Sequence, residues 1–252
     1  MAKINASTFN DFVRNIQITW RMGWEDYPLN AKQLFDVVEN KLEVTDHSSI
    51  EGQTYARRID ESDDYRQENP TQNYVKTMTK YRVGLEAIIT WRMRHYDRYR
   101  EIDRLLRNLG RASARKMDLD LTHRLTFANS ASYTDQDGVS ITTTVGDGLA
   151  LLSTAHTVPG SSTTFRNRVL NNPPFSRSGL EQAELLCAVQ MLKTDGTVVT
   201  VDPDTIITPN IPELLNKVKE FLKSTASPTV SNSGVTNVYQ SRFNHVVLPK
   251  LA

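Results

Sequence analysis

Residues 46–80 contain almost no large aliphatic side chains and many charged ones, in the run DHSSIEGQTYARRIDESDDYRQENPTQNYVKTMTK. A segment of this composition cannot bury enough apolar surface to offset the conformational entropy lost on folding. It is therefore either disordered or an extended excursion that becomes ordered only against something else. Any core of the protein must be built from the segments before and after it.

The composition of the chain limits the classes of function that remain. Its 252 residues suffice for one large domain or two modest ones. The net charge of +1 creates no long-range field, so attraction to nucleic acid or to a membrane must come from local clusters. A single cysteine, Cys187, excludes an internal disulfide and a thiolate-rich metal site. We expect a soluble protein without an export signal, because no run of about 18 apolar residues occurs.

The longest predicted helix covers residues 93–128, where apolar residues recur every three to five positions. Gly110 weakens this helix by about 1 kcal/mol relative to Ala, which favours a bend or a break there. At about 100° per residue, one side of the helix is basic and the opposite side is apolar. The basic side holds Arg100, Arg104, Arg107, Arg111 and Arg115, and the apolar side holds Ile102, Leu105, Leu109 and Ala112.

This arginine stripe has two interpretations. A solvated charged face is the simpler one, since most surface helices are charged. The functional one is contact with an anionic partner, either the phosphates of a nucleic acid or the acidic run DESDDYRQE at 60–68 of a neighbouring copy. The carboxylates that begin this run are Asp60, Glu61, Asp63 and Asp64.

The other elements predict an α+β protein with long excursions. Alternation in YRVGLEAIITW predicts a strand over 81–91. An amphipathic helix is predicted over 177–194, with Ser178 as its N-cap and Glu181 at the capping-box position. The buried side of that helix is expected to hold Leu180, Leu185, Val189 and Leu192. Two strands are predicted in 195–210, a helix from Pro212 to Phe221, and strand composition in 234–252. Near the N-terminus, a short helix or arm is predicted on Leu34, Val37, Val38, Leu42 and Val44.

The run DGLALLSTAH looks like a catalytic motif because Ser153 precedes His156 by three residues. A nucleophile elbow requires small residues around its serine, since the turn is strained. Leu151 and Leu152 stand there instead. We therefore expect His156 to be hydrogen-bonded at a strand end, and a hydrolase with Ser153 as nucleophile and His156 as base is the alternative.

Phosphate and metal motifs are incomplete. Gly146 and Gly148 begin a G-x-G pattern, but Leu151 occupies the third glycine position, so a tight turn is expected. YTDQDGVSITTT resembles a calcium loop, yet aligning Gly138 with its sixth position places Thr144 where a bidentate Glu is required. No metal and no cofactor are expected, because the histidines show no ligand spacing. They are His47, His95, His123, His156 and His245.

The order of these segments resembles the major capsid proteins of tailed bacteriophages and prophages, which share the HK97-like fold. The residues that carry the resemblance are DGVSITTTVGDGLALLSTAHTVPGSSTTFRN and the later DGTVVTVDPDTIITPNIPELL, and it covers roughly 50 to 250. It implies four regions: an N-terminal arm at 1–45, an extended loop across an adjacent subunit at 46–90, a peripheral domain with a long spine helix at 91–144, and an axial domain of mixed sheet flanked by helices at 145–252.

The same resemblance implies a structural protein rather than an enzyme. Its subunits would self-assemble into the pentamers and hexamers of an icosahedral shell around double-stranded DNA, bound non-specifically. Portal, scaffold or decoration proteins would be further partners, without a membrane. The protein would be located in the virion after synthesis in the host bacterial cytoplasm. A nucleic-acid-binding module that uses the arginine stripe is a further alternative.

Overall fold

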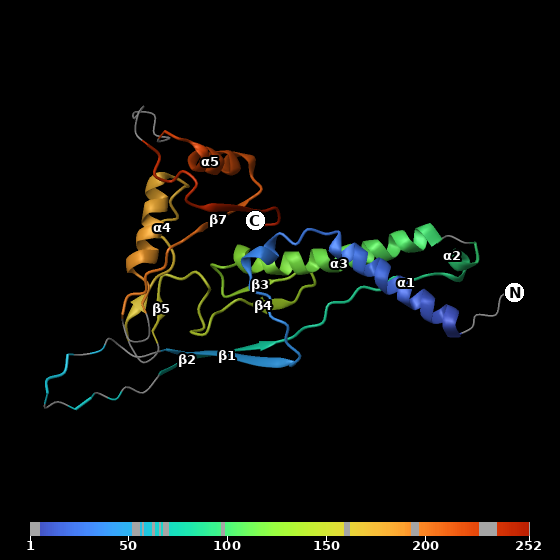
Figure 1. Ribbon diagram of the computed structural model, residues 1–252, viewed down its shortest axis with the longest axis horizontal. Helices are drawn as coiled ribbons and strands as arrows, with labels where there is room; N and C mark the ends of the chain where they lie inside the picture. The colour runs from blue at the N-terminus through green and yellow to red at the C-terminus, as the bar shows by residue number, and fades with distance from the viewer. Residues whose placement is uncertain are drawn as a thin grey trace. The chain divides into compact units, whose positions relative to one another are not determined.

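The computed structural model describes residues 6–51, 56, 58–61, 64–65, 67, 71–96, 99–158, 162–192, 197–226 and 236–251 (Figure 1). Helices and short strands follow one another along the chain, so the predicted α+β class is confirmed. The chain divides into two compact units. Unit 1 comprises Met1–Asn40 and Lys80–His123, and unit 2 comprises Lys41–Thr79 and Arg124–Ala252.

Unit 1 is helical in its described part. The predicted long helix is confirmed over most of its length, but its first residues form a separate short helix that Thr90 caps by accepting from the Met93 N–H at 3.3 Å. The last turn of the long helix, from Arg124, belongs to unit 2. The elements are α1 (Ala6–Glu25), the 3-10 helix η1 (Ala31–Leu34), α2 (Trp91–His95) and α3 (Tyr99–Thr126).

Helices α1 and α3 cross (Figure 1), and a pair of glycines lies at the crossing. A Cβ added to Gly23 would lie 2.8 Å from Cα of Arg107, and one added to Gly110 would lie 2.8 Å from the Trp24 nitrogen. Both distances are shorter than van der Waals contact, so the two backbones touch where side chains are absent. The expected bend or break at Gly110 does not occur, because the glycine serves this crossing and α3 continues through it.

The buried side of α3 winds around the helix instead of following one line. Buried residues recur at every fourth position, and four residues advance about 400°, so each step moves the buried side by about 40°. It starts opposite Arg100 and reaches the side of Arg111 and Arg115 farther along. The fixed apolar side predicted through Leu105, Leu109 and Ala112 was wrong, since all three are only half-buried. The buried residues are Ile102, Leu106, Gly110, Ala114, Asp118 and Thr122.

Beyond α1 the chain is held to α3 by a buried carboxylate. The Ala31 N–H at the start of η1 donates to Asp118 Oδ1 at 3.0 Å, and both residues are buried. The helix or arm expected around Leu34–Val44 is limited to the single turn of η1, because Val37 and Val38 have no core to face and are exposed. Sequence analysis missed α1 altogether.

Unit 2 begins with the two ends of the polar excursion, which pair as an antiparallel hairpin. Strand β1 (Val44–Glu51) pairs with β2 (Thr71–Thr79) in a register that sets Val44 opposite Thr79, with a shift between Ser48 and Ile50. The excursion is therefore ordered at its base by backbone hydrogen bonds rather than by apolar burial. Only scattered residues between the strands are described.

A second hairpin and a third strand pair follow. Strand β3 (Ser132–Thr134) pairs antiparallel with β4 (Ser140–Thr142), and the turn between them contains Gly138 at φ 77°. Strand β5 (His156–Thr157) pairs with β6 (Thr164–Phe165). The polar turn expected around Gly138 is confirmed.

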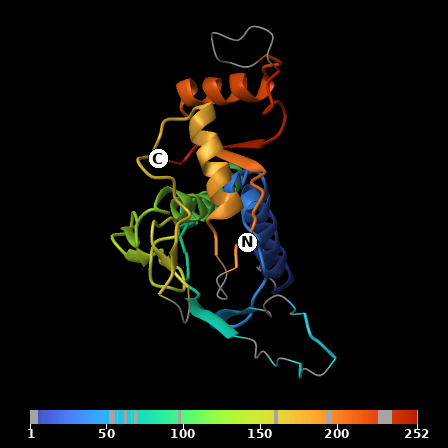
Figure 2. The same ribbon diagram turned by 90° about the vertical axis from the view of Figure 1, so that its left-hand side faces the viewer.

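The core of unit 2 lies between two helices and a parallel strand pair. Strands β7 (Thr205–Pro209) and β8 (Asn244–Leu248) are parallel and are connected through α5 (Pro212–Lys223), which Figure 2 shows crosswise to α4 (Arg177–Val189). The helix predicted from Pro212 is confirmed. The predicted mixed sheet was wrong for the described residues, whose strands form separate pairs. The buried cluster consists of Val218, Phe221, Leu222, Tyr239 and Phe243.

Helix α4 begins and faces slightly differently from the prediction. Ser176, not Ser178, is the N-cap, and its hydroxyl accepts from the Gly179 N–H at 3.2 Å. Leu186 is buried while Leu185 and Val189 are more than half exposed, so the predicted buried side was wrong by one residue. The helix ends before the predicted end at 194.

His245 connects the two parallel strands. Its Nε2 lies 2.8 Å from the Thr208 hydroxyl across the β7–β8 pair. Burial, assisted by the positive charge of Lys219, lowers the pKa of His245 below its usual 6.5. The folded protein therefore holds this ring neutral at a pH at which the unfolded chain begins to protonate it.

We expect Gly110→Ala to lower the free energy of unfolding by about 1–3 kcal/mol, because its Cβ overlaps the α1 backbone. Without that contact, Ala would stabilise a helix by about 1 kcal/mol. A loss of stability therefore shows that the two helices touch at Gly110. Urea unfolding followed by circular dichroism measures it. The control is Gly84→Ala, where a Cβ meets nothing within 4 Å. Equal effects of the two substitutions would contradict the crossing.

The lowered pKa of His245 predicts a pH dependence of stability. Above pH 6.5 the neutral ring costs nothing, and as the pH falls below that value the unfolded state binds a proton that the folded state does not. The urea midpoint should therefore decrease between pH 7 and about 5.5. His245→Gln should make the urea midpoint depend less on pH. His47→Gln, at an exposed residue, should leave the pH dependence of the midpoint unchanged. An unchanged slope in His245→Gln would rule the explanation out.

Candidate functional site

The arginine stripe of α3 divides into two parts in the structure. Arg111 forms an ion pair with Asp26 at 3.1 Å, and the Arg115 guanidinium lies over the Tyr27 ring at 6.0 Å from its centroid. Both partners follow α1, on the side to which the buried residues of α3 have turned. Two of the five predicted site arginines thus stabilise unit 1.

The side chains of the other three arginines are exposed, although the backbone of Arg107 contacts Gly23 at the crossing with α1. Arg100, Arg104 and Arg107 are exposed and form no ion pair with another described residue. Their spacing of four and three residues places them on one side of α3. With their neighbours they surround a shallow hollow of about 430 Å³. Its lining is Arg100, Asp103, Arg104, Arg107, Asn108 and Arg111.

The acidic run lies between β1 and β2. Asp60, Glu61 and Asp64 are exposed and have no ion pair with another described residue. Asp63, the fourth predicted acidic residue, lies outside the described residues. Tyr65 beside them is 86% exposed. A negative segment with an unburied aromatic ring is available for contact outside its own unit.

A row of apolar side chains is exposed along residues 81–91 of unit 1. The predicted strand was wrong, since residues 81–90 have no regular secondary structure and α2 starts at Trp91. The side chains that would have entered a core are instead 51–71% exposed. Soluble monomers seldom leave a continuous apolar row in water. The row consists of Tyr81, Val83, Leu85, Ile88 and Trp91.

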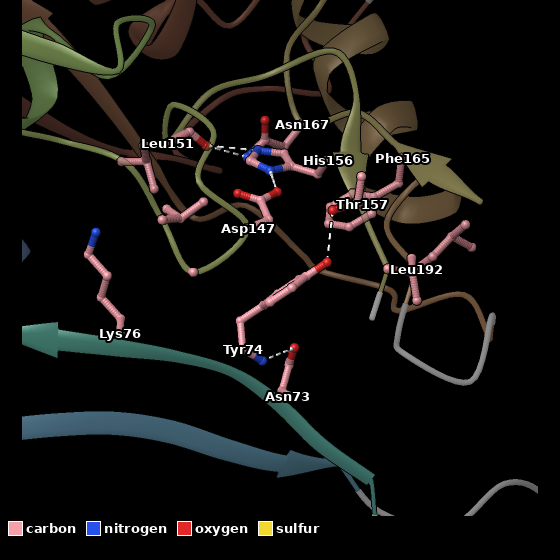
Figure 3. Close-up of a pocket in the computed structure, with 13 residues that line it drawn as sticks. Asn73, Tyr74, Lys76, Asp147, Leu151, His156, Thr157, Phe165, Asn167 and Leu192 are labelled. Atoms are coloured by element: carbon pink, nitrogen blue, oxygen red, sulfur yellow. Dashed lines mark hydrogen bonds and ion pairs between the residues drawn. The ribbon is translucent and has the colours of Figure 1, made fainter. Parts of the chain in front are cut away.

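Unit 2 contains a pocket of about 370 Å³ between β2 and the loop that leads to β5 (Figure 3). The Tyr74 hydroxyl lies 2.9 Å from the Thr157 hydroxyl, and Lys76 Nζ donates to the Thr144 hydroxyl at 3.1 Å. A Cβ at Gly146 would lie 2.5 Å from the Tyr74 Cβ, so only glycine allows this approach. Polar contacts thus hold the hairpin on the loop.

A buried pair of polar side chains, Asp147 and His156, lines this pocket. His156 Nδ1 lies 2.7 Å from Asp147 Oδ2, and His156 Nε2 lies 3.3 Å from the Leu151 carbonyl (Figure 3). The side chains are only 6% and 4% exposed. Burial alone would raise the pKa of Asp147, but hydrogen bonds from His156 and the Leu149 N–H outweigh it and lower that pKa.

The structure does not bring Ser153 and His156 together as a catalytic pair. The Ser153 hydroxyl accepts from the Ala155 N–H at 3.3 Å, and both nitrogens of the His156 ring are already bonded. A general base needs a free ring nitrogen within hydrogen-bond reach of the nucleophile. His156 therefore closes the loop, as expected of a histidine at a strand end, since β5 starts at this residue.

The glycine and acidic motifs are turns. Gly148 has φ 81°, and the Asp147 Oδ1 accepts from the Leu149 N–H at 2.9 Å, which closes the turn after Gly146. Among the described residues no group of three or more His, Cys, Asp or Glu side chains is arranged to hold a metal ion. No helix in the described ranges is long and apolar enough to cross a membrane.

Comparison with known proteins gives no relative: no family model, no curated protein and no solved structure matches the chain.

Sequence reasoning missed Asp147 and Tyr74, although both help to build the pocket. Asp147 precedes His156 by nine residues, a spacing that no common catalytic motif contains, and it was assigned only to a turn. Tyr74 belongs to the polar excursion, where it is one of three tyrosines, and its aromatic ring was the one available signal.

Breaking the buried pair should destabilise unit 2. We expect Asp147→Asn to lower the free energy of unfolding by about 1.5–3 kcal/mol, because it weakens buried hydrogen bonds to a carboxylate. Ser153→Ala removes one long hydrogen bond and should cost less than about 1 kcal/mol. Chemical unfolding at pH 7 compares them. A larger loss for Ser153→Ala would contradict this assignment.

Proposed function

We propose that the protein is a shell-forming structural subunit, a major capsid protein of the HK97-like type from a tailed bacteriophage or prophage. The exposed apolar row from Tyr81 to Trp91 is the observation that carries this proposal. Its function would be self-assembly into the pentamers and hexamers of an icosahedral shell around double-stranded DNA. Its location would be the virion.

The apolar row supports assembly on energetic grounds. Leu85 and Ile88 are 64% and 71% exposed, and burying a large aliphatic side chain is worth about 1.5–3 kcal/mol. Residues 81–90 also belong to no strand or helix, so another copy can pair with their backbone. Contact with other copies would bury the apolar side chains and pair this backbone at once.

The order of elements supports the same proposal. A hairpin with a long polar connection, β1–β2, is followed by the 28-residue helix α3 and then by an α+β unit. In the proposed protein, 1–45 would be the arm, 46–90 the extended loop, 91–144 the peripheral domain and 145–252 the axial domain. Portal, scaffold and decoration proteins would be its further partners.

The proposed subunit needs no catalytic group. The hydrolase alternative has no observation in its favour, because His156 is bonded to Asp147 and Leu151. The alternative of a nucleic-acid-binding module depends on Arg100, Arg104 and Arg107 alone.

Self-assembly is tested on the purified full chain by sedimentation velocity and negative-stain electron microscopy. We expect large closed or open assemblies, in equilibrium with rings of subunits. Leu85→Asp and Ile88→Asp should shift this equilibrium to monomers, because a charge in the apolar contact is desolvated without a partner. Circular dichroism should show both variants folded.

The matched control is Val139→Asp, which places the same charge at a residue that is 58% exposed on the β3–β4 turn. It should leave assembly unchanged. A wild-type chain that stays monomeric over a wide range of concentration and salt would overturn the proposed function.

A further inference from the structure

We propose that Arg100, Arg104 and Arg107 of one copy bind the acidic residues Asp60, Glu61 and Asp64 of a second copy. This inference rests on the proposed function and names the charged part of one subunit contact. We call the three arginines the arginine face. We call Asp60, Glu61 and Asp64 the acidic segment.

The helix geometry selects these three arginines. The buried side of α3 starts opposite Arg100 and turns by about 40° with every fourth residue. It therefore meets the arginine stripe only at Arg111 and Arg115, which Asp26 and Tyr27 engage. The side chains of Arg100, Arg104 and Arg107 stay exposed.

The hollow at the arginine face suits separate carboxylates. Four arginines and Asp103 line the hollow, and Arg111 is paired with Asp26. Arg100, Arg104 and Arg107 therefore supply the positive charges that have no ion pair with another described residue. Each guanidinium can bind one carboxylate with two parallel hydrogen bonds. Three separate carboxylates therefore match the three guanidinium groups in number and charge.

The acidic segment has the matching properties. Its described carboxylates are exposed and have no ion pair with another described residue. Tyr65, 86% exposed, and Ile59, 38% exposed, flank them and add apolar area. Tyr99, which precedes Arg100 on α3, is likewise 54% exposed. Charge and apolar surface thus match on both sides of one contact.

Two charge-reversed variants of the full chain test the pairing. In the first, Arg100, Arg104 and Arg107 are replaced by Glu, and in the second, Asp60, Glu61 and Asp64 are replaced by Lys. Each variant alone should self-associate about tenfold or more weakly than wild type at low salt. The wild-type association should weaken as salt is added, because screening acts on exposed charges.

An equimolar mixture of the two variants distinguishes contact between copies from contact within one chain. Where the two variants alternate, the reversed arginine face of the first meets the reversed acidic segment of the second. The native arginine face of the second then meets the native acidic segment of the first. The mixture should therefore recover association when the separate variants do not. Recovery only in a chain that carries all six substitutions would place the contact within one copy and overturn the inference.

Matched controls separate this pairing from net charge and from folding. Arg21, Arg177 and Lys217 form exposed pairs with Glu four residues later or earlier, which contribute little to stability. Reversing these three residues to Glu changes the net charge equally and should leave association intact. Circular dichroism verifies that every variant folds.

Each remaining outcome has one meaning. Assembly of both charge-reversed variants at wild-type strength would overturn this inference while the proposed function stands. A wild-type chain that does not assemble would overturn both. Loss of affinity for duplex DNA in the arginine variant, with unchanged self-association, would assign the face to nucleic acid instead.

Discussion

The close crossing of α1 over α3 determines the surface of unit 1. Two backbones can approach this far only where Gly23 and Gly110 lack side chains. Once α1 is fixed there, the chain that follows it lies along the later turns of α3, and Asp26 and Tyr27 meet Arg111 and Arg115. The crossing therefore decides which arginine side chains contact the chain after α1 and which stay exposed. One packing contact divides the basic stripe into a packed part and an exposed part.

Unit 2 is held together in two different ways. Around α5 the core is apolar and aromatic, with Phe221 between Phe175 and Tyr239 at centroid distances of 5.6 and 5.2 Å. The loop under the hairpin relies on the polar pair of Asp147 and His156 instead. A buried polar pair contributes little net stability compared with apolar packing, but it tolerates few alternative arrangements. The loop that receives β2 is thereby given one geometry, which is what a hairpin poor in apolar residues requires.

The sequence predicted the elements whose signals are local. The period of α3, the proline that starts α5 and the glycine turn at Gly138 depend on neighbouring residues, and all three are found. The errors concern distant contacts: Gly110 was interpreted as a weak point because its partner helix α1 was not recognised, although Ile16, Trp20 and Trp24 already have helical spacing. Alternating apolar residues at 81–91 predicted a buried strand. The pattern indicates that these side chains favour burial, but it does not say whether the same chain or another molecule buries them.

The exposed apolar row at 81–91 bears on function. A pattern typical of burial, found exposed in a folded chain, means that the burial occurs elsewhere or that the chain tolerates an aggregation-prone surface. The exposed row lies on the same unit as three outward-facing arginines, and the acidic segment on unit 2 has the opposite charge. Apolar area supplies affinity, while arranged charges supply register and exclude wrong partners. A subunit that must meet many copies of itself in one orientation needs both, and this chain leaves both uncovered.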